Sequence, residues 1–122
     1  MRCPCLSGLP YEECCGPLHL GTATAPTAER LMRSRYSAFA VGDTAYLLAS
    51  WHPSSRPHDV ELNPDQEWLS LEIVGRTAGG MLDTEGTVEF RATYRFEGQR
   101  YEQNENSRFV RLDKRWVYYS AV

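Results

Sequence analysis

The four cysteines of this chain are the residues whose types and spacing point most directly to chemistry. They all lie near the N-terminus, in the stretch MRCPCLSGLPYEECCG, at Cys3, Cys5, Cys14 and Cys15. A disulfide within either close pair would be strained. Disulfides across the pairs would close two short loops in a chain of 122 residues, which is long enough to build its own core. A redox pair usually has the spacing C-x-x-C, which is absent here.

Zinc fits this cysteine set better than a disulfide or a redox pair. Zn²⁺ takes four soft ligands tetrahedrally, and Ser7, Gly8 and Pro10 suit a turn that brings the two pairs together. The sequence therefore predicts one structural Zn²⁺ held by the four cysteines, with no open position for catalysis. We expect Arg2 or the N-terminal amine to offset the charge of the sulfurs, and His19 is an alternative ligand.

Composition and charge exclude several classes of protein. The net charge is −3, with Lys and Arg spread along the chain, so nothing draws the whole protein toward nucleic acid or anionic lipid. The longest uncharged run, CCGPLHLGTATAPTA, contains two prolines and is neither a membrane span nor a signal-peptide core. We expect a cytoplasmic protein with no membrane partner.

Helical patterns follow the cysteine segment. The stretch APTAERLMRSRYSAFAVGD has apolar residues at helical spacing and a glycine at its end, so it predicts a first helix. Asp43 suits the N-cap of a second helix, TAYLLASWH, which we expect Pro53 to stop after His52. Residues 54–62 are irregular, and Asn63 with Gln66 resembles a capping box that predicts a short helical turn.

From Trp68 onward the apolar period changes to two. The stretches WLSLEIVGRT, GTVEFRATYRFEG, RYEQNENSRFVRL and RWVYYSAV predict strands separated by turns at AGG, EG and DK. Val88, Phe90 and Ala92 share one face of the second strand, and Glu89 and Arg91 are expected on a solvated outer face. Helices followed by an antiparallel sheet predict an α+β domain with the helices on one face of the sheet.

The N-terminal stretch CPCLSGLPYEECCG resembles the SEC-C motif, a small zinc module also found at the tail of the SecA motor, with the pattern C-x-C-G-S-G followed by C-C or C-H. Leu6 stands where the motif usually has Gly. Together with APTAERLMRSRYSAFAVGDTAYLLASWHP and SRFVRLDKRWVYY, it resembles the YchJ-like bacterial family. That resemblance implies a SEC-C motif over residues 1–18 and an NTF2-like (cystatin-like) domain over 25–122, whose curved sheet and helices form a cone.

The resemblance to NTF2-like proteins also implies a candidate pocket, because related cones are used as active sites. The residues that could line it are Tyr36, Trp51, His52, Trp68, Tyr94, Glu105, Ser107, Phe109 and Tyr118. The aromatic residues could equally belong to the core, and His52 could serve only the helix dipole. Glu105 and Ser107 either line a polar part of the cone or lie on an exposed edge.

Two function classes remain open. In the first, the zinc knuckle presents residues such as Leu6, Leu9 and Tyr11 to a protein or nucleic-acid partner. In the second, zinc is purely structural and the cone binds or transforms a small apolar molecule. The sequence has no acid, base or nucleophile motif, which favours a non-enzymatic role. By analogy with NTF2-like domains, a homodimer through the sheet is expected.

Overall fold

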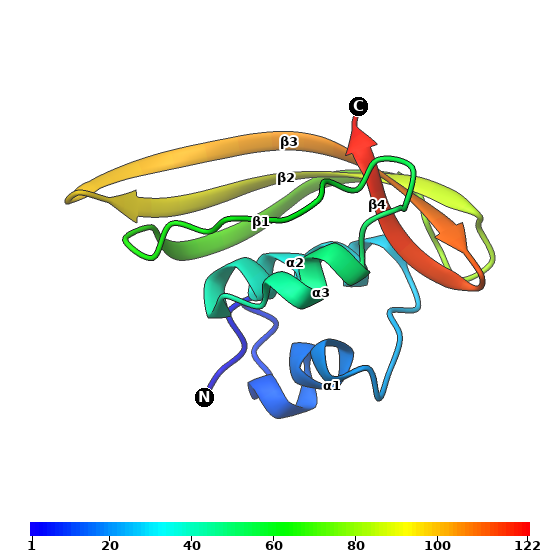
Figure 1. Ribbon diagram of the computed structural model, residues 1–122, viewed down its shortest axis with the longest axis horizontal. Coiled ribbons are helices and arrows are strands. Elements are labelled where there is room, and N and C mark those ends of the chain that lie inside the picture. The colour runs from blue at the N-terminus through cyan, green and yellow to red at the C-terminus, as the bar shows by residue number, and fades with distance from the viewer.

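The protein has three layers, which are visible in Figure 1. This computed structural model describes residues 1–122. An antiparallel sheet in the order β1-β2-β3-β4 forms the first layer, two helices (α2 and α3) form the second, and the N-terminal segment (residues 1–24) covers the helices from the side away from the sheet. The elements are η1 Tyr11–Glu13, α1 Cys15–Leu20, α2 Ala28–Val41, α3 Thr44–Ala49, β1 Glu67–Ala78, β2 Glu85–Phe96, β3 Gln99–Leu112 and β4 Arg115–Ala121.

The central helix α2 begins and ends as its sequence predicts. The Thr27 side chain accepts a hydrogen bond from the Arg30 backbone N–H, which caps the first turn. Gly42 ends the helix with a φ of 81°, a conformation in which glycine is not strained. Because α2 lies between the sheet and the N-terminal segment, residues on both of its sides are buried.

Helix α3 is shorter than the sequence predicts. Asp43 caps it as expected, because its Oδ1 accepts from the Tyr46 backbone N–H at 3.0 Å. The helix ends at Ala49, however, and does not reach His52. Beyond it the chain pairs with β4: the Tyr118 N–H donates to the Ser50 carbonyl and the His52 N–H donates to the Tyr118 carbonyl, both at 2.8 Å. These bonds to β4 replace the last helical turn.

The predicted helical turn at Asn63 is also wrong. Asn63 Oδ1 accepts from the Asp65 N–H at 2.9 Å, which forms a local turn, and β1 then begins at Glu67. Asn favours such turns because its side chain can bond to the backbone two residues further on. Residues 54–62 are irregular, as expected.

The sheet follows the predicted alternation. Val88, Phe90 and Ala92 of β2 are buried against the helices. The outer face is charged, as expected, and Arg91 and Arg95 pair there with carboxylates of β1. Strand β4 pairs with β3 only as far as Ser107, and the Val122 N–H donates to the Asn106 carbonyl at 2.7 Å, so residues 99–105 of β3 form a free edge.

The core is continuous from the sheet to the cysteines. One cluster of 14 buried residues joins all four cysteines to the apolar residues of α2 and the sheet, among them Leu31, Met32, Tyr36, Phe90 and Phe109. The N-terminal segment is therefore packed onto the second domain rather than merely tethered to it. None of the helices has the length and hydropathy that a membrane-spanning helix requires.

Candidate metal centre and cavity

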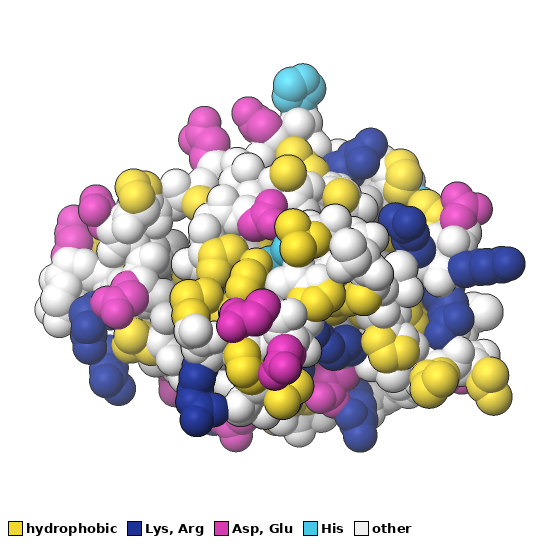
Figure 2. Space-filling model, turned by 90° about the horizontal axis from the view of Figure 1, so that it is seen from below, with side chains coloured by type: hydrophobic (Ala, Val, Ile, Leu, Met, Phe, Trp, Pro, Cys, Tyr) yellow, Lys and Arg dark blue, Asp and Glu magenta, His cyan; other side chains and the backbone are white.

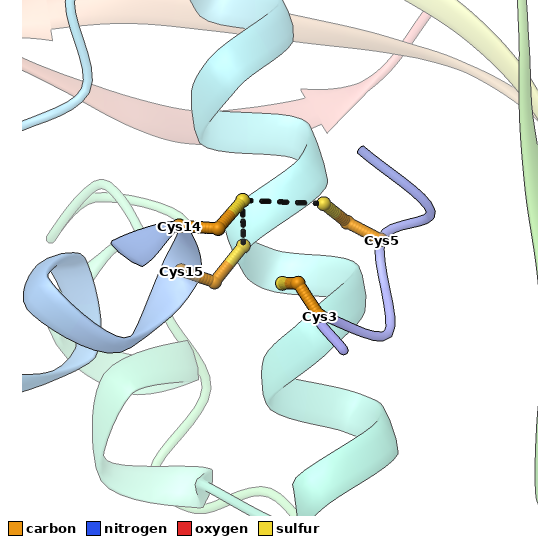
Figure 3. Close-up of side chains that lie close together, drawn as sticks. All are labelled: Cys3, Cys5, Cys14 and Cys15. Atoms are coloured by element: carbon orange, nitrogen blue, oxygen red, sulfur yellow. Dashed lines mark hydrogen bonds between the residues drawn. The ribbon is translucent and has the colours of Figure 1, made fainter. Parts of the chain in front are cut away.

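The four cysteine sulfurs converge on one point beside α2, as Figure 3 shows. All four residues are buried, and their sulfurs all lie within 4.8 Å of one another. The sulfur of Cys14 is 3.7 Å from that of Cys5 and 4.0 Å from that of Cys15. These separations are too long for a disulfide. They are close to the separation of about 3.8 Å that four sulfurs would have at the corners of a tetrahedral zinc site with bonds of about 2.3 Å.

The loop between the two cysteine pairs is closed by backbone bonds. Cys3 N–H donates to the Leu9 carbonyl at 2.9 Å, and Tyr11 N–H donates to the Met1 carbonyl at 2.8 Å. Within the loop, Leu6 has a φ of 65°, in the left-handed region. Glycine reaches this region without strain, which explains physically why the SEC-C pattern usually has Gly at this position. The ligand set is unaffected by the leucine.

A second group of contacts fixes the helical half of the metal centre. The Tyr11 hydroxyl lies 2.5 Å from His19 Nδ1, and His19 Nε2 lies 2.8 Å from the Ser34 carbonyl of α2. His19 is thus occupied on both nitrogens and does not belong to the cysteine cluster. A Cβ at Gly16 would lie 2.8 Å from the Tyr11 carbonyl oxygen, so this position accepts no side chain without a shift.

The cation that faces the sulfurs comes from α2 rather than from the N-terminus. Arg30 donates from Nη1 to the Cys15 sulfur at 3.4 Å and from Nη2 to the Cys14 sulfur at 3.5 Å. Arg33 donates to the Cys5 carbonyl at 3.0 Å and to Glu29 at 3.2 Å. Arg2, which the sequence suggested for this role, instead donates to the Gly8 carbonyl. Arg30 thus offsets the negative charge that metal-binding thiolates carry.

The thiol and guanidinium pKa values reflect this crowding. The interaction with the neighbouring Cys15 side chain is the main reason that the pKa of Cys5 is lowered to about 4. The same contact and burial raise the pKa of Cys15, while burial first of all raises that of Cys14. Burial acts to lower the pKa of Arg30, but its contacts with the cysteine sulfurs raise it overall. Because cysteine binds metals as the thiolate, protons would be released when a metal binds at this site.

A separate cavity of about 180 Å³ lies on the other side of α2, under the sheet. Four residues that the resemblance placed in a pocket line it, namely Trp51, Glu105, Ser107 and Tyr118. The cavity is completed by five residues outside that set, Met32, Arg35, Phe39, Phe90 and Gln103. Arg35 is the unexpected member, because it is not among the pocket candidates named from the sequence.

The remaining pocket candidates lie elsewhere. Trp68 contacts both Tyr36 and Tyr94, with ring centres 5.8 and 5.2 Å apart, in an aromatic cluster at the sheet. Phe109 is fully buried beneath Tyr118. His52 stacks edge-on against a tyrosine of β4 and accepts from Ser54, so it does not serve the helix dipole of α3. Of the pocket candidates, only the four named above therefore line the cavity.

Family models match almost the whole chain. Residues 2–17 match the SEC-C motif, and residues 27–121 match the domain described as "YchJ, middle NTF2-like domain". The chain belongs to the YchJ family. The resemblance drawn from the sequence is thereby confirmed, and so is the α+β, NTF2-like fold with helices on one face of the sheet.

Named relatives of the family cover the same span. A UPF0225 protein of Streptomyces coelicolor is 53% identical over 116 residues, which cover 95% of this chain and 90% of the relative. One of Deinococcus radiodurans is 44% identical over 121 residues, covering 98% and 88%. Neither name describes an activity.

Two solved structures of SEC-C motif-containing proteins have the same fold. The solution structure of one from Rhodopseudomonas palustris has a TM-score of 0.87 at 36% identity and covers 100% of this chain and 98% of its own. The crystal structure of one from Psychrobacter arcticus has a TM-score of 0.77 at 27% identity, covering 97% and 78%. The joining of a cysteine module to this sheet is therefore shared with other proteins.

Proposed function

We propose that the four cysteines hold one structural Zn²⁺ ion and that the protein is a zinc-dependent interaction module. Four convergent sulfurs select a soft or borderline metal, and a tetrahedral Cys₄ set suits zinc. Such a set leaves no ligand position for water, so the metal would hold the N-terminal segment in shape rather than perform a reaction. Because the thiols lie at metal-binding rather than disulfide distance, we also propose a reducing compartment, the cytoplasm.

Native mass spectrometry of protein purified without chelator tests the metal. We expect one zinc ion per chain, released together with loss of structure at the N-terminal segment when a strong chelator is added. A metal-free protein with two disulfides, or one that carries iron in place of zinc, would contradict this part of the proposal.

The interaction proposal is carried by two exposed leucines in the loop between the cysteine pairs. Leu6 is 58% exposed and Leu9 is 49% exposed, and we call this pair the knuckle tip. Both lie in a loop that the cysteines on either side tie down, so little conformational freedom would be lost on binding. Figure 2, which views the molecule from the side of the N-terminal segment, shows apolar side chains gathered among charged ones on this face.

The charge around the knuckle tip favours a protein partner over a nucleic acid. Glu12 and Glu13 are exposed in the next turn and outnumber the one exposed cation bound to the loop, Arg2, and the whole chain has a net charge of −3. A phosphate backbone would be repelled by these carboxylates. A protein surface with an apolar patch bordered by Lys or Arg would complement them.

Affinity measurements with a purified partner test this surface. Immobilised wild-type protein loaded with zinc is used to capture the partner, which is then purified. Its dissociation constant is measured for the wild type, for a Leu6→Ser/Leu9→Ser variant and for Leu82→Ser. We expect the double variant to bind about tenfold more weakly, because two central apolar contacts are lost.

Leu82 is the matched control because it is 99% exposed and lies in the turn between β1 and β2. Its substitution should leave the affinity unchanged. The proposal fails if the double variant binds as tightly as the wild type, if binding survives removal of zinc, or if an oligonucleotide binds at the knuckle tip more tightly than any protein.

A further inference from the structure

The cavity beneath the sheet contains a buried cation that the metal centre does not use. Arg35 is only 4% exposed, and its guanidinium lies 5.0 Å from the centre of the Trp51 ring and 4.8 Å from that of Tyr118. Its two hydrogen bonds, to the Leu47 carbonyl and the Ser50 hydroxyl, both come from Nη1. The Nε and Nη2 donors of Arg35 are therefore available to a molecule in the cavity.

An acceptor lies on another wall of the same cavity. Glu105 accepts hydrogen bonds from the hydroxyls of Ser107 and Tyr118, and both bonds go to Oε2. Its Oε1 remains free to accept another bond. Glu105 and Arg35 are not paired with each other, since each is held by neutral groups instead. A ligand between the two side chains could accept a hydrogen bond from Arg35 and donate one to Glu105.

The indole of Trp51 adds another donor without a partner. Its Nε1 is buried and has no hydrogen-bond partner. Buried donors are nearly always paired, so an unpaired one next to a polar cavity favours an acceptor that enters with a ligand. Burial also lowers the pKa of Arg35 to about 10, which leaves the guanidinium protonated at neutral pH.

Size and apolar surface limit what the cavity can hold. Its volume is about 180 Å³, and Met32, Phe39 and Phe90 supply an apolar wall. A cavity of about 150 Å³ is enough for benzene, so a single six-membered ring with one polar substituent fits this one. The two formal charges on the walls are opposite, so a ligand with a net charge of either sign would lie near a like charge.

We propose that this cavity binds a small, uncharged ring compound that carries an amide, with the carbonyl oxygen accepting from Arg35 and the N–H donating to Glu105. An amide is neutral and holds a carbonyl acceptor and an N–H donor side by side, so it can face the guanidinium with one atom and the carboxylate with the other. The site does not involve the cysteines, so the test of this proposal is independent of the test of the proposed zinc-dependent interaction.

An NMR titration of ¹⁵N-labelled protein with three ring compounds of similar size tests the proposal. Benzamide is neutral, benzoate is an anion and benzylamine is a cation. The Trp51 indole signal, identified by its absence in Trp51→Phe, reports on the cavity. We expect benzamide to shift it saturably, with a dissociation constant in roughly the millimolar range for so small a ligand, and the two charged compounds to bind more weakly.

Glu105→Gln is the decisive variant, since it removes the charge but keeps the size of the side chain. We expect it to weaken benzamide at least about threefold, because a hydrogen bond to a charged group is stronger than one to a neutral group. Glu102→Gln is the matched control: Glu102 lies on the same strand but pairs with Arg91 on the outer face. The affinity of the Glu102→Gln variant for benzamide should equal that of the wild type.

Three results would overturn the proposal: no saturable shift with benzamide, an unchanged affinity in Glu105→Gln, or tighter binding of benzoate or benzylamine. Arg35→Met is a supplementary variant only, because Arg35 also supports the end of α3 and its loss could unfold that region.

Discussion

At the scale of single residues, Leu6 occupies a backbone conformation that is unfavourable for leucine, yet the loop keeps its shape. Its φ of 65° belongs to the left-handed region, which costs a non-glycine residue about 1 to 2 kcal/mol. The backbone hydrogen bonds on either side hold the loop closed and offset this cost. Leu6 is also one of the two exposed leucines of the knuckle tip, so the same residue that strains the loop adds to the proposed contact surface.

Leu6→Gly should therefore tighten metal binding slightly. The strain energy released by glycine exceeds the free-energy cost of its greater entropy in the unfolded chain by about 0.5 kcal/mol. This difference corresponds to roughly twofold higher metal affinity. Competition with a chromophoric chelator measures it. Leu9→Gly is the control, since Leu9 has no positive φ and gains no relief. Equal effects of the two substitutions would show that strain at Leu6 is not the cause.

Tyr118 and Glu105 form the second residue-scale pair. Burial first, and then the charge and the hydrogen bond of Glu105, raise the pKa of Tyr118 to about 12. The unfolded tyrosine ionises near its ordinary value of 10, so above that pH the unfolded state loses a proton that the folded state keeps. This tyrosine accordingly contributes to a loss of stability as the pH rises from 10 toward 12.

Glu105→Gln should lower the pKa of Tyr118, because the carboxylate charge is removed while burial remains. Ultraviolet absorbance of the phenolate, followed during alkaline titration, measures the change. Tyr118→Phe identifies the contribution of Tyr118, because burial also raises the pKa of Tyr36 to about 12. If Glu105→Gln leaves the titration as it is, the two side chains do not interact in the way their 3.3 Å contact indicates.

At the scale of elements, α2 serves two sites from opposite sides. Arg30 faces the cysteines, whereas Arg35, five positions along the helix, faces the cavity under the sheet. At about 100° per residue the two side chains point in widely different directions. The helix is thus the common wall of the candidate metal centre and the cavity.

Arg30→Met should weaken metal binding by about tenfold, since it removes both donors to the cysteine sulfurs while keeping a long side chain. Zinc transfer to a competing chelator at equilibrium measures the loss. Arg76→Met provides the comparison, because Arg76 pairs with Glu29 at the surface and contacts no sulfur. A similar loss in both variants would point to a general effect of charge instead of contact with the sulfurs.

At the scale of the whole molecule, the N-terminal segment and the sheet share one core through α2. The cysteines pack on one side of the helix, and residues such as Met32 and Tyr36 join them to the apolar side chains of the sheet. The sheet and α2 also have many contacts of their own, so the segment depends more on the metal than the sheet does. The homodimer expected from the sequence remains a prediction.

Removal of the metal should destabilise the N-terminal segment more than the sheet. We expect backbone amides of residues 1–24 to lose hydrogen-exchange protection, while β2 and β3 keep theirs and the melting temperature falls by roughly 10 °C. Hydrogen exchange and thermal unfolding, with and without chelator under reducing conditions, provide the test. Simultaneous loss of protection in the sheet would mean that the metal centre and the sheet unfold as one unit.

The sequence alone predicts the features that depend on neighbours along the chain. The spacing of the cysteines identifies the sulfur cluster, the caps at Asp43 and Gly42 place helix ends, and the alternation in β2 identifies its buried face. Each of these is a relation between residues that lie close together in the sequence, in which a residue type constrains the backbone, a face or a ligand set.

Only the tertiary structure decides what depends on partners far away in the chain. It ends α3 early, because β4 takes the backbone bonds of Ser50 and His52. It also assigns Arg30 to the sulfurs and Arg35 to the cavity, although both arginines occur within one short helical stretch. The physical reason is that an arginine side chain is long and its partner is chosen by packing, which the pattern of a single helix does not contain.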